Sequence, residues 1–215
     1  EELGERIAES VRLRMVSDVP VGAFLSGGLD SSPVVAHLAR ATAHGASAHG
    51  ASREPVRTFT IGFGERVYDE SRHARTVAAR FGTDHTEARV ESDALAVLPR
   101  LAWHYGEPFG DSSAIPTFHV SALAARHVKV VLSGDAGDEL FLGYPRHAAA
   151  ALADRIHGWP APARWALGAM RHAIPPSVGV HSRRRQMRKF LEDLGRPADA
   201  RFRDWVCVFP EADRL

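Results

Sequence analysis

The sequence predicts an α/β fold in which a parallel sheet carries helices on both faces, because strand and helix patterns alternate along most of the chain. Strand-like runs occupy 21–25, 57–63, 84–90 and 128–132. Helical patterns occupy 3–15, 34–40, 70–81, 92–105 and 115–126. After about residue 151 only helical, arginine-rich sequence follows. We therefore expect one domain over 1–150 and a partial helical extension over 151–215.

The opening elements are predicted as helix, strand, loop and helix. From Leu3 to Met15 an apolar residue recurs at every fourth position, which predicts one buried stripe on a helix. Pro20 ends this helix, because the residue before a proline is driven out of the helical region. The apolar run 21–25 is typical of a buried parallel strand. Pro33 then stands just inside the next helix, where its missing N–H has no intrahelical partner to lose.

The later elements repeat the alternation. The segment 42–55 is rich in Ala, His, Gly and Ser without an apolar period, so it is predicted as a surface loop. The run 57–63 alternates and contains β-forming residues, which favours a second strand. The following helix stops at Gly82, the next strand covers 84–90, and Ser92 is a suitable N-cap for the helix after it.

Composition excludes several classes of protein. A formal net charge of +1 gives no reason to expect a nucleic acid or an anionic membrane as partner. The single cysteine, Cys207, excludes an internal disulfide, and no apolar run approaches the roughly 20 residues that span a bilayer. We therefore predict a cytoplasmic protein. The chain opens at Glu1 inside a helical pattern and without Met, which predicts a piece of a longer protein. The sequence leaves the oligomeric state open, including a homodimer.

Two polar loops follow strands of the predicted sheet. The segment 26–32, with sequence SGGLDSS, follows the first strand, and 133–139, with sequence SGDAGDE, follows the last. Ligands of open parallel sheets bind at the carboxyl ends of the strands, so both loops can face one site. In the first loop Gly27 and Gly28 let the backbone approach an anion, and the next helix adds the positive end of its dipole.

The remaining residues of the first loop indicate a phosphate site that uses a metal. Ser26, Ser31 and Ser32 offer hydroxyl donors. Asp30 would repel phosphate unless a cation bridges the two, and Mg²⁺ prefers one or two carboxylates together with phosphate oxygens. Either Asp135 or Asp138 on the second loop could supply the second carboxylate.

Other well-known motifs do not fit. The common P-loop needs a lysine directly after glycine, and neither Lys129 nor Lys189 follows one. Phe24 stands where the nucleophile elbow of lipases requires glycine. No His-Glu-x-x-His or paired-cysteine metal motif is present in the sequence.

With two further blocks, these loops resemble the synthetase domain of the asparagine synthetase family, part of the PP-loop group of ATP pyrophosphatases. The matching blocks are 16–20 with 25–32, 58–63 with 68–70, 107–117, and 133–144. Their number and order argue against a chance match. The resemblance implies a Rossmann-like sheet similar to that of the adenine nucleotide α-hydrolases.

The resemblance also implies a two-step ligase that uses ATP and Mg²⁺. A carboxylate, the side chain of aspartate in the namesake enzyme, attacks the α-phosphorus of ATP to give an acyl-adenylate and pyrophosphate. Ammonia then displaces AMP and leaves the amide, asparagine. The family's glutaminase domain is absent from this sequence and is expected in the full-length protein, so the chain as given would use free ammonia.

Carried over by position, the resemblance implies roles for particular residues. ATP and pyrophosphate would be bound at Leu25, Ser26, Gly27, Gly28, Asp30, Ser31, Ser32, Ile61, Gly62, Ser133 and Gly134. Asp30 and Asp138 would bind Mg²⁺, while Asp135 and Tyr144 would serve adenylate formation. Possible substrate contacts are Asp111, Ser112 and Ser113.

Simpler interpretations stay open for several of these residues. Asp138 and Glu139 would also be favoured as an acidic pair at a helix N-terminus, and Tyr144 could serve packing alone. The segment 111–113 could be a helix cap.

The sequence departs from the family pattern at two positions and leaves rival functions open. Ala136 and Leu142 stand where the family usually has glycine, so the second loop is expected to sit slightly differently. One rival is a related amidotransferase or cyclase that acts on another carboxylate. Others are a nucleotide-binding fragment without catalysis and an RNA-modifying PP-loop enzyme, against which the near-neutral charge counts.

Overall fold

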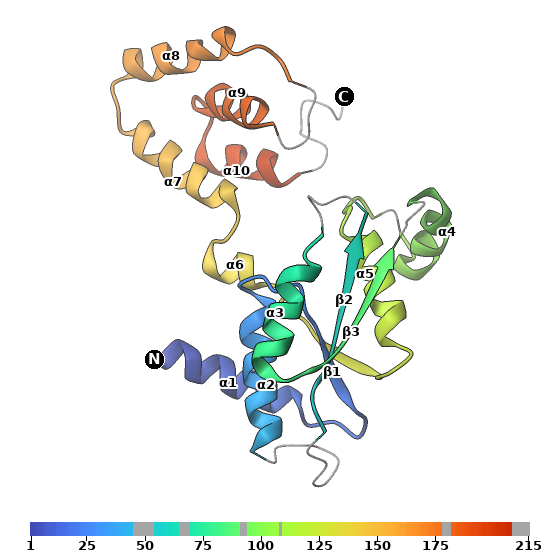
Figure 1. The fold of residues 1–215 in the computed structure, drawn as a ribbon. Coiled ribbons are helices and arrows are strands. Elements are labelled where there is room, and N and C mark those ends of the chain that lie inside the picture. The colour runs from blue at the N-terminus through green and yellow to red at the C-terminus, as the bar shows by residue number, and fades with distance from the viewer. Residues whose placement is uncertain (45–53, 65–68, 91–93, 108, 178–181, 208–215) are drawn as a thin grey trace. The chain divides into compact units, whose positions relative to one another are not determined.

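The computed structural model describes residues 1–44, 54–64, 69–90, 94–107, 109–177 and 182–207 (Figure 1). The chain divides into two compact units, Glu1–Ala136 and Gly137–Leu215. The predicted domain ranges 1–150 and 151–215 stay a prediction. Three sequence expectations, the N-cap Ser92, the residue Tyr68 and most of the loop 42–55, lie outside the described residues.

The first unit contains a four-stranded parallel sheet. Its strands are β1 (Val21–Phe24), β2 (Arg57–Phe63), β3 (Asp84–Val90) and β4 (Val130–Leu132). Their order in the sheet is β3-β2-β1-β4, and every neighbouring pair is parallel. Phe24 of β1 is level with Phe59 of β2, so β2 continues beyond the paired part of β1. The predicted parallel α/β fold is confirmed.

Helices cover both faces of this sheet (Figure 1). They are α1 (Glu2–Arg14), α2 (Ser31–Ala43), α3 (Ser71–Phe81), α4 (Ala94–Tyr105) and α5 (Ala114–Ala124). On one face Ala23 and Leu25 pack among residues of α1, α2 and α3. On the other face Phe59 packs against Ala124 of α5, with Phe24 beside them. Because Phe24 lies between Ala23 and Leu25, this alternation reproduces the two-residue period of a strand buried on both sides.

The second unit is helical. Its elements are α6 (Gly137–Phe141), α7 (Pro145–His157), α8 (Ala161–Ala169), the 3₁₀ helix η1 (Met170–Ala173), α9 (Arg183–Asp193) and α10 (Ala198–Val206). Ala153, Ile156, Leu191 and Leu194 form its core. Helices begin earlier than the predicted position near residue 151, because Pro145 stands at the first turn of α7, where proline is well tolerated. None of the helices in the described ranges is long and apolar enough to cross a membrane.

Candidate functional site

The two predicted loops leave adjacent strands at the point where the sheet reverses its order. The chain runs from β1 outward to β2 and β3, and then returns to place β4 on the other side of β1. Ala23 of β1 pairs with Leu132 of β4, so both strands end at the same edge. This edge between β1 and β4 is the topological switch point, the position at which open α/β sheets bind ligands.

Gly27 gives the loop after β1 its conformation. Its φ of 81° lies in the left-handed region, which glycine adopts without steric cost. A Cβ at this position would lie 2.4 Å from the carbonyl carbon of His73 and 2.5 Å from the amide nitrogen of Ala74. The first turn of α3 therefore packs directly against the backbone of the loop, and the site requires glycine for two independent reasons.

Hydrogen bonds within the segment 26–32 hold the loop in shape. The hydroxyls of Ser26 and Ser31 lie 2.9 Å apart, and Ser31 Oγ also accepts the N–H of Ser26 at 3.2 Å. Ser26 Oγ accepts the N–H of Gly28 at 3.2 Å, while Ser32 donates its hydroxyl to the carbonyl of Gly28 at 2.6 Å. The predicted phosphate-binding residues thus form one preorganised turn at the start of the 13-residue helix α2.

The loop after β4 meets this turn. A Cβ at Gly134 would lie 2.6 Å from the carbonyl carbon of Asp30 and 2.7 Å from the amide nitrogen of Ser31. Ser133 donates its hydroxyl to Asp135 Oδ2 at 2.9 Å, which fixes that carboxylate within the loop. The structure therefore brings the predicted nucleotide residues of both loops together in the first unit.

Ile61 and Gly62 lie in the part of β2 that extends beyond β1. Leu25 joins the two strands through its N–H, which donates to the carbonyl of Phe59 at 2.9 Å. Ile61 is level with Ala88 of β3, and Gly62 is level with Arg89. Both therefore lie at the carboxyl edge of the sheet, where the loop after β1 begins.

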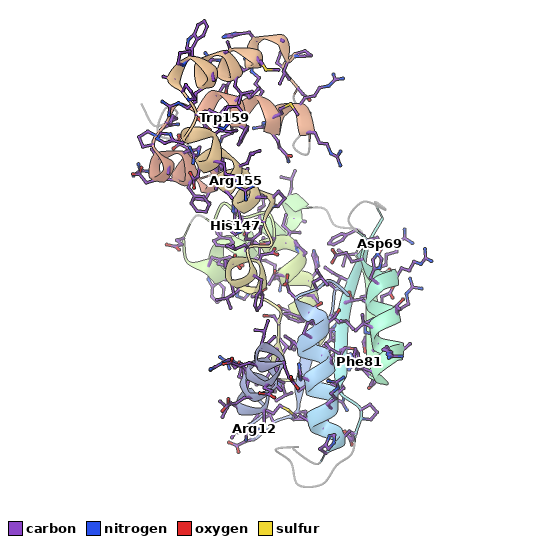
Figure 2. All side chains as sticks on the ribbon, turned by 90° about the vertical axis from the view of Figure 1, so that its left-hand side faces the viewer. Arg12, Asp69, Phe81, His147, Arg155 and Trp159 are labelled. Carbon is purple, nitrogen blue, oxygen red and sulfur yellow. The ribbon has the colours of Figure 1, made fainter. Side chains whose placement is uncertain are left out.

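Asp69, to which the sequence pattern assigns no role, also lies at this edge. Figure 2 shows it at the start of α3, with Phe81 at the other end of that helix. Asp69 Oδ1 accepts the N–H of Ser71 at 3.1 Å and would lie 3.1 Å from a Cβ at Gly62. The hydrogen bonds from Ser71 lower the pKa of this carboxyl group. Its side chain thereby links the start of α3 to the predicted nucleotide residue Gly62, and its position beside Glu70 in a matched block was the available signal.

Ala136 and Leu142, the two departures from the family pattern, have backbone conformations that favour glycine. Their φ angles are 71° and 57°, both in the left-handed region. Both side chains are exposed, and 67% of the Leu142 surface is accessible. The cost of the replacement is therefore backbone strain of about 1–2 kcal/mol per residue, without a steric clash to add to it.

In the second unit, Gly143 makes room for Asp138. A Cβ at Gly143 would lie 2.0 Å from Asp138 Oδ1, and the N–H of Gly143 donates to the carbonyl of Asp138 at 2.9 Å. The carboxylate thus lies directly over a glycine. The described residues contain no group of three or more His, Cys, Asp or Glu side chains that could hold a metal, so the assignment of Asp30 and Asp138 to Mg²⁺ stays a prediction.

Tyr144 forms a pair with Glu139. Its hydroxyl donates to Glu139 Oε1 at 2.8 Å. This hydrogen bond lowers the pKa of Glu139 and raises the pKa of Tyr144. Tyr144 is therefore held as a neutral hydrogen-bond donor near neutral pH, and its predicted role in adenylate formation stays a prediction.

The residues predicted as substrate contacts lie at the start of α5. Asp111 Oδ1 accepts the N–H of Ser113 at 2.8 Å, a turn contact just before α5, whose N-cap Ser113 makes no side-chain capping hydrogen bond. Asp111 and Ser112 also line a cavity of about 360 Å³ together with Tyr105 and Phe109. The turn contact uses one carboxylate oxygen of Asp111, and the role of 111–113 as substrate contacts stays a prediction.

The fold and the two loops define a class: an α/β protein with a glycine-rich, hydroxyl-rich turn at the switch point of its sheet. Within this class, the family model described as asparagine synthase matches residues 2–207, and the chain belongs to this family. The resemblance inferred from the four sequence blocks is therefore confirmed.

Curated relatives agree with the family assignment. A putative glutamine-hydrolyzing asparagine synthetase 2 from Methanocaldococcus jannaschii is 45% identical over 68% of this chain and 27% of its own length. A glutamine-hydrolyzing asparagine synthetase 1 from Bacillus subtilis is 37% identical over 66% of this chain and 21% of its own length. An amidase, chyE, from Penicillium rubens is 34% identical over 73% of this chain and 24% of its own length. The chain thus spans about a quarter of the length of these relatives.

Proposed function

We propose that the chain is the ATP-using part of an amide-forming ligase. It would activate a carboxylate, the side chain of L-aspartate, as its acyl-adenylate with release of pyrophosphate, and ammonia would then displace AMP to give asparagine. The observation that carries the proposal is the contact between the two loops, in which Gly134 lies against the backbone of Asp30 and Ser31. This contact supports one shared binding site at the end of β1 and β4.

The loop after β1 would bind the pyrophosphate portion of ATP. Its backbone N–H groups, and whichever hydroxyl of the Ser26–Ser31 pair keeps its proton, can donate to phosphate oxygens, while Ser32 would have to turn its hydroxyl away from the carbonyl of Gly28. The helix α2 directs its positive dipole end toward the phosphates. Preorganised donors of this kind stabilise charge that develops during the reaction without a cost of reorganisation. Ser133 and Gly134 would line the nucleotide from the second loop, and Asp135 would act in adenylate formation.

The donor set fits a magnesium ion. Neither 26–32 nor 133–139 contains Lys or Arg, so these loops supply no cation of their own to balance the phosphates. Asp30 and Asp138 would hold the ion, in agreement with the preference of Mg²⁺ for a few carboxylates plus phosphate oxygens. When bound, the ion would neutralise charge on the phosphates and orient them.

The acid is the least determined part of the proposal. The relatives named asparagine synthetases favour aspartate, and a relative named an amidase favours a second candidate, a different carboxylate in the same reaction type. The names of the first relatives also support a glutaminase domain as the source of ammonia in the full-length protein.

Exchange of labelled pyrophosphate into ATP tests the proposal without ammonia. With Mg²⁺ present, we expect exchange that depends on L-aspartate. Exchange that requires a different acid would show that the substrate is a carboxylate other than L-aspartate. A chain that neither exchanges pyrophosphate with any acid nor binds Mg-ATP would refute the proposed function.

A further inference from the structure

A cavity of about 330 Å³ lies in the second unit, between the start of α7 and the helices α9 and α10. Its lining residues are Tyr144, Pro145, Arg146, Ala149, Gln186, Lys189, Phe190 and Trp205. Binding sites for small organic molecules have volumes from about 300 Å³ upward and mostly apolar walls with a few placed polar groups. The cavity therefore has the size and lining of a small-molecule site.

Two cations in the wall give this cavity its charge. The guanidinium of Arg146 lies 3.8 Å above the ring of Tyr144, and its Nε is buried without a hydrogen-bond partner among the described residues. Lys189 Nζ donates to the backbone carbonyl of Asp204 at 3.2 Å and keeps further donors available. None of the described lining residues is acidic, although the Glu139 carboxylate, which accepts from Tyr144, lies near enough to Arg146 for the guanidinium to help lower the pKa of Glu139.

Aromatic side chains form the apolar part of the wall. The rings of Phe190 and Trp205 lie 6.2 Å apart. Trp205 Nε1 donates to Asp193 Oδ2 at 2.7 Å, which fixes the orientation of the indole. The wall is thus held in place before any ligand binds, and this lowers the entropic cost of binding.

The cavity beside Asp111 shows that a positively charged lining is specific to the cavity of the second unit. That cavity, in the first unit, is of similar size and also aromatic, but Glu107 and Asp111 line it. A carboxylate ligand would be repelled there. At the cavity of the second unit, the same ligand could accept hydrogen bonds from Arg146 and Lys189, and guanidinium groups bind carboxylates in a bidentate geometry.

We propose that the cavity formed by α7, α9 and α10 binds an organic acid, with its carboxylate on Arg146 and Lys189 and an aromatic or aliphatic body against Phe190 and Trp205. Tyr144 is also predicted to serve adenylate formation, but the inference can be tested apart from the proposed function, because binding of the acid requires neither ATP nor Mg²⁺. A small polar amino acid such as aspartate would leave the aromatic wall uncovered and would bind more weakly.

Isothermal titration with 3-phenylpropionate, in the absence of nucleotide, tests this site. We expect saturable binding and at least about tenfold weaker binding of the neutral 3-phenylpropionamide, since a lost hydrogen bond to a charged group lowers affinity by about that factor. L-Aspartate should also bind more weakly, because it leaves the aromatic wall uncovered. Arg146→Gln and Lys189→Gln should each weaken the acid by about tenfold and leave the amide unchanged.

Arg184→Gln is the matched control, because Arg184 is an exposed cation of α9 outside the lining. It should leave the affinity for 3-phenylpropionate unchanged. Thermal melts of all three variants would show whether each remains folded, and Lys189→Gln keeps the test decisive if Arg146→Gln does not fold. Equal affinity for acid and amide, no binding of 3-phenylpropionate, or an equal loss in Arg184→Gln would overturn the proposal.

Discussion

Left-handed backbone positions are filled by different residues in the loop after β1 and in the segment 136–142. The loop after β1 uses glycine at its left-handed position, Gly27, where any side chain would collide with the backbone of α3. At the family's usual glycine positions after β4, this chain has Ala136 and Leu142, whose exposed side chains meet no such obstacle. Glycine is therefore indispensable where a positive φ coincides with a close backbone contact. Where the side chain faces solvent, the same φ costs about 1–2 kcal/mol and is tolerated.

The largest effect should come from Gly27→Ala. The new Cβ adds a steric clash of about 1–3 kcal/mol to a backbone cost of about 1–2 kcal/mol, so we expect the free energy of unfolding to fall by about 2–5 kcal/mol. Urea denaturation followed by circular dichroism would measure it. Gly28→Ala is the control: its Cβ would meet only Ser26 Oγ at 3.3 Å, so a loss within about 1 kcal/mol is expected. Equal losses in the two variants would show that the close contact with α3 does not determine the loss of stability in Gly27→Ala.

A second effect should appear at the glycine under Asp138. Gly143→Ala would displace the Asp138 carboxylate, because the new Cβ and Oδ1 cannot occupy the same space. If Asp138 binds the metal, Mg²⁺-dependent ATP affinity should fall by about 10- to 100-fold, as when the support of a metal ligand is removed. Gly195→Ala, at a glycine of the same unit with no neighbour within 4 Å, should leave that affinity unchanged. Unchanged affinity in Gly143→Ala would remove Asp138 from the metal site.

The strained positions should respond in the opposite direction. Ala136→Gly and Leu142→Gly each remove about 1–2 kcal/mol of backbone strain but add about 0.4–1 kcal/mol of chain entropy to the unfolded state. We expect a net stabilisation below about 1.5 kcal/mol, with ATP affinity preserved or improved. Ala163→Gly, at an exposed helical alanine of α8, should destabilise by about 0.5–1 kcal/mol in the same denaturation assay. A clear loss of ATP affinity in Ala136→Gly would show that this loop has a geometry of its own.

The smallest effect concerns pH. The pKa of Asp69 is lowered in the folded state by its hydrogen bonds from Ser71, so its stabilising contribution is present above the unfolded value of about 4. That contribution is lost as the pH falls through the lowered folded pKa. The stability difference between wild type and Asp69→Asn should therefore be present near neutral pH and shrink in acid. A difference independent of pH would show that the charge of Asp69 plays no part in stabilising the start of α3.

Much of this site could be predicted from the sequence because its signals are local. The strand, the SGGLDSS turn and the helix with Pro33 in its first turn are contiguous, and each residue type has a conformational reason to be there. The parallel sheet follows from the same alternation. The sequence predicts that both loops lie at one edge of the sheet. It does not predict that Gly134 in particular contacts Asp30.

The rest depends on contacts between residues far apart in the sequence. Nothing near Gly27 indicates that the backbone of His73 packs against it. For the carboxylate of Asp69 beside Gly62, the matched block 68–70 is a signal of importance but not of this contact. The cation-lined cavity joins α7 to α9 and α10, which are separated by dozens of residues, so Arg146 and Lys189 could not be paired from local pattern. The acidic pair Asp138 and Glu139 indicates the helix start at Gly137 only as an alternative, and no local pattern predicts the start at Pro145.

Titration of Mg-ATP into the wild-type chain and Asp30→Ala is the decisive measurement for the nucleotide site. We expect binding that requires Mg²⁺ in the wild type, and a loss of about thirtyfold or more in Asp30→Ala, since the phosphates would lose the residue that holds their cation. Asp18→Ala, at an exposed residue before β1, should bind as the wild type does. Unchanged Mg-ATP affinity in Asp30→Ala would contradict a nucleotide site where the loops after β1 and β4 meet.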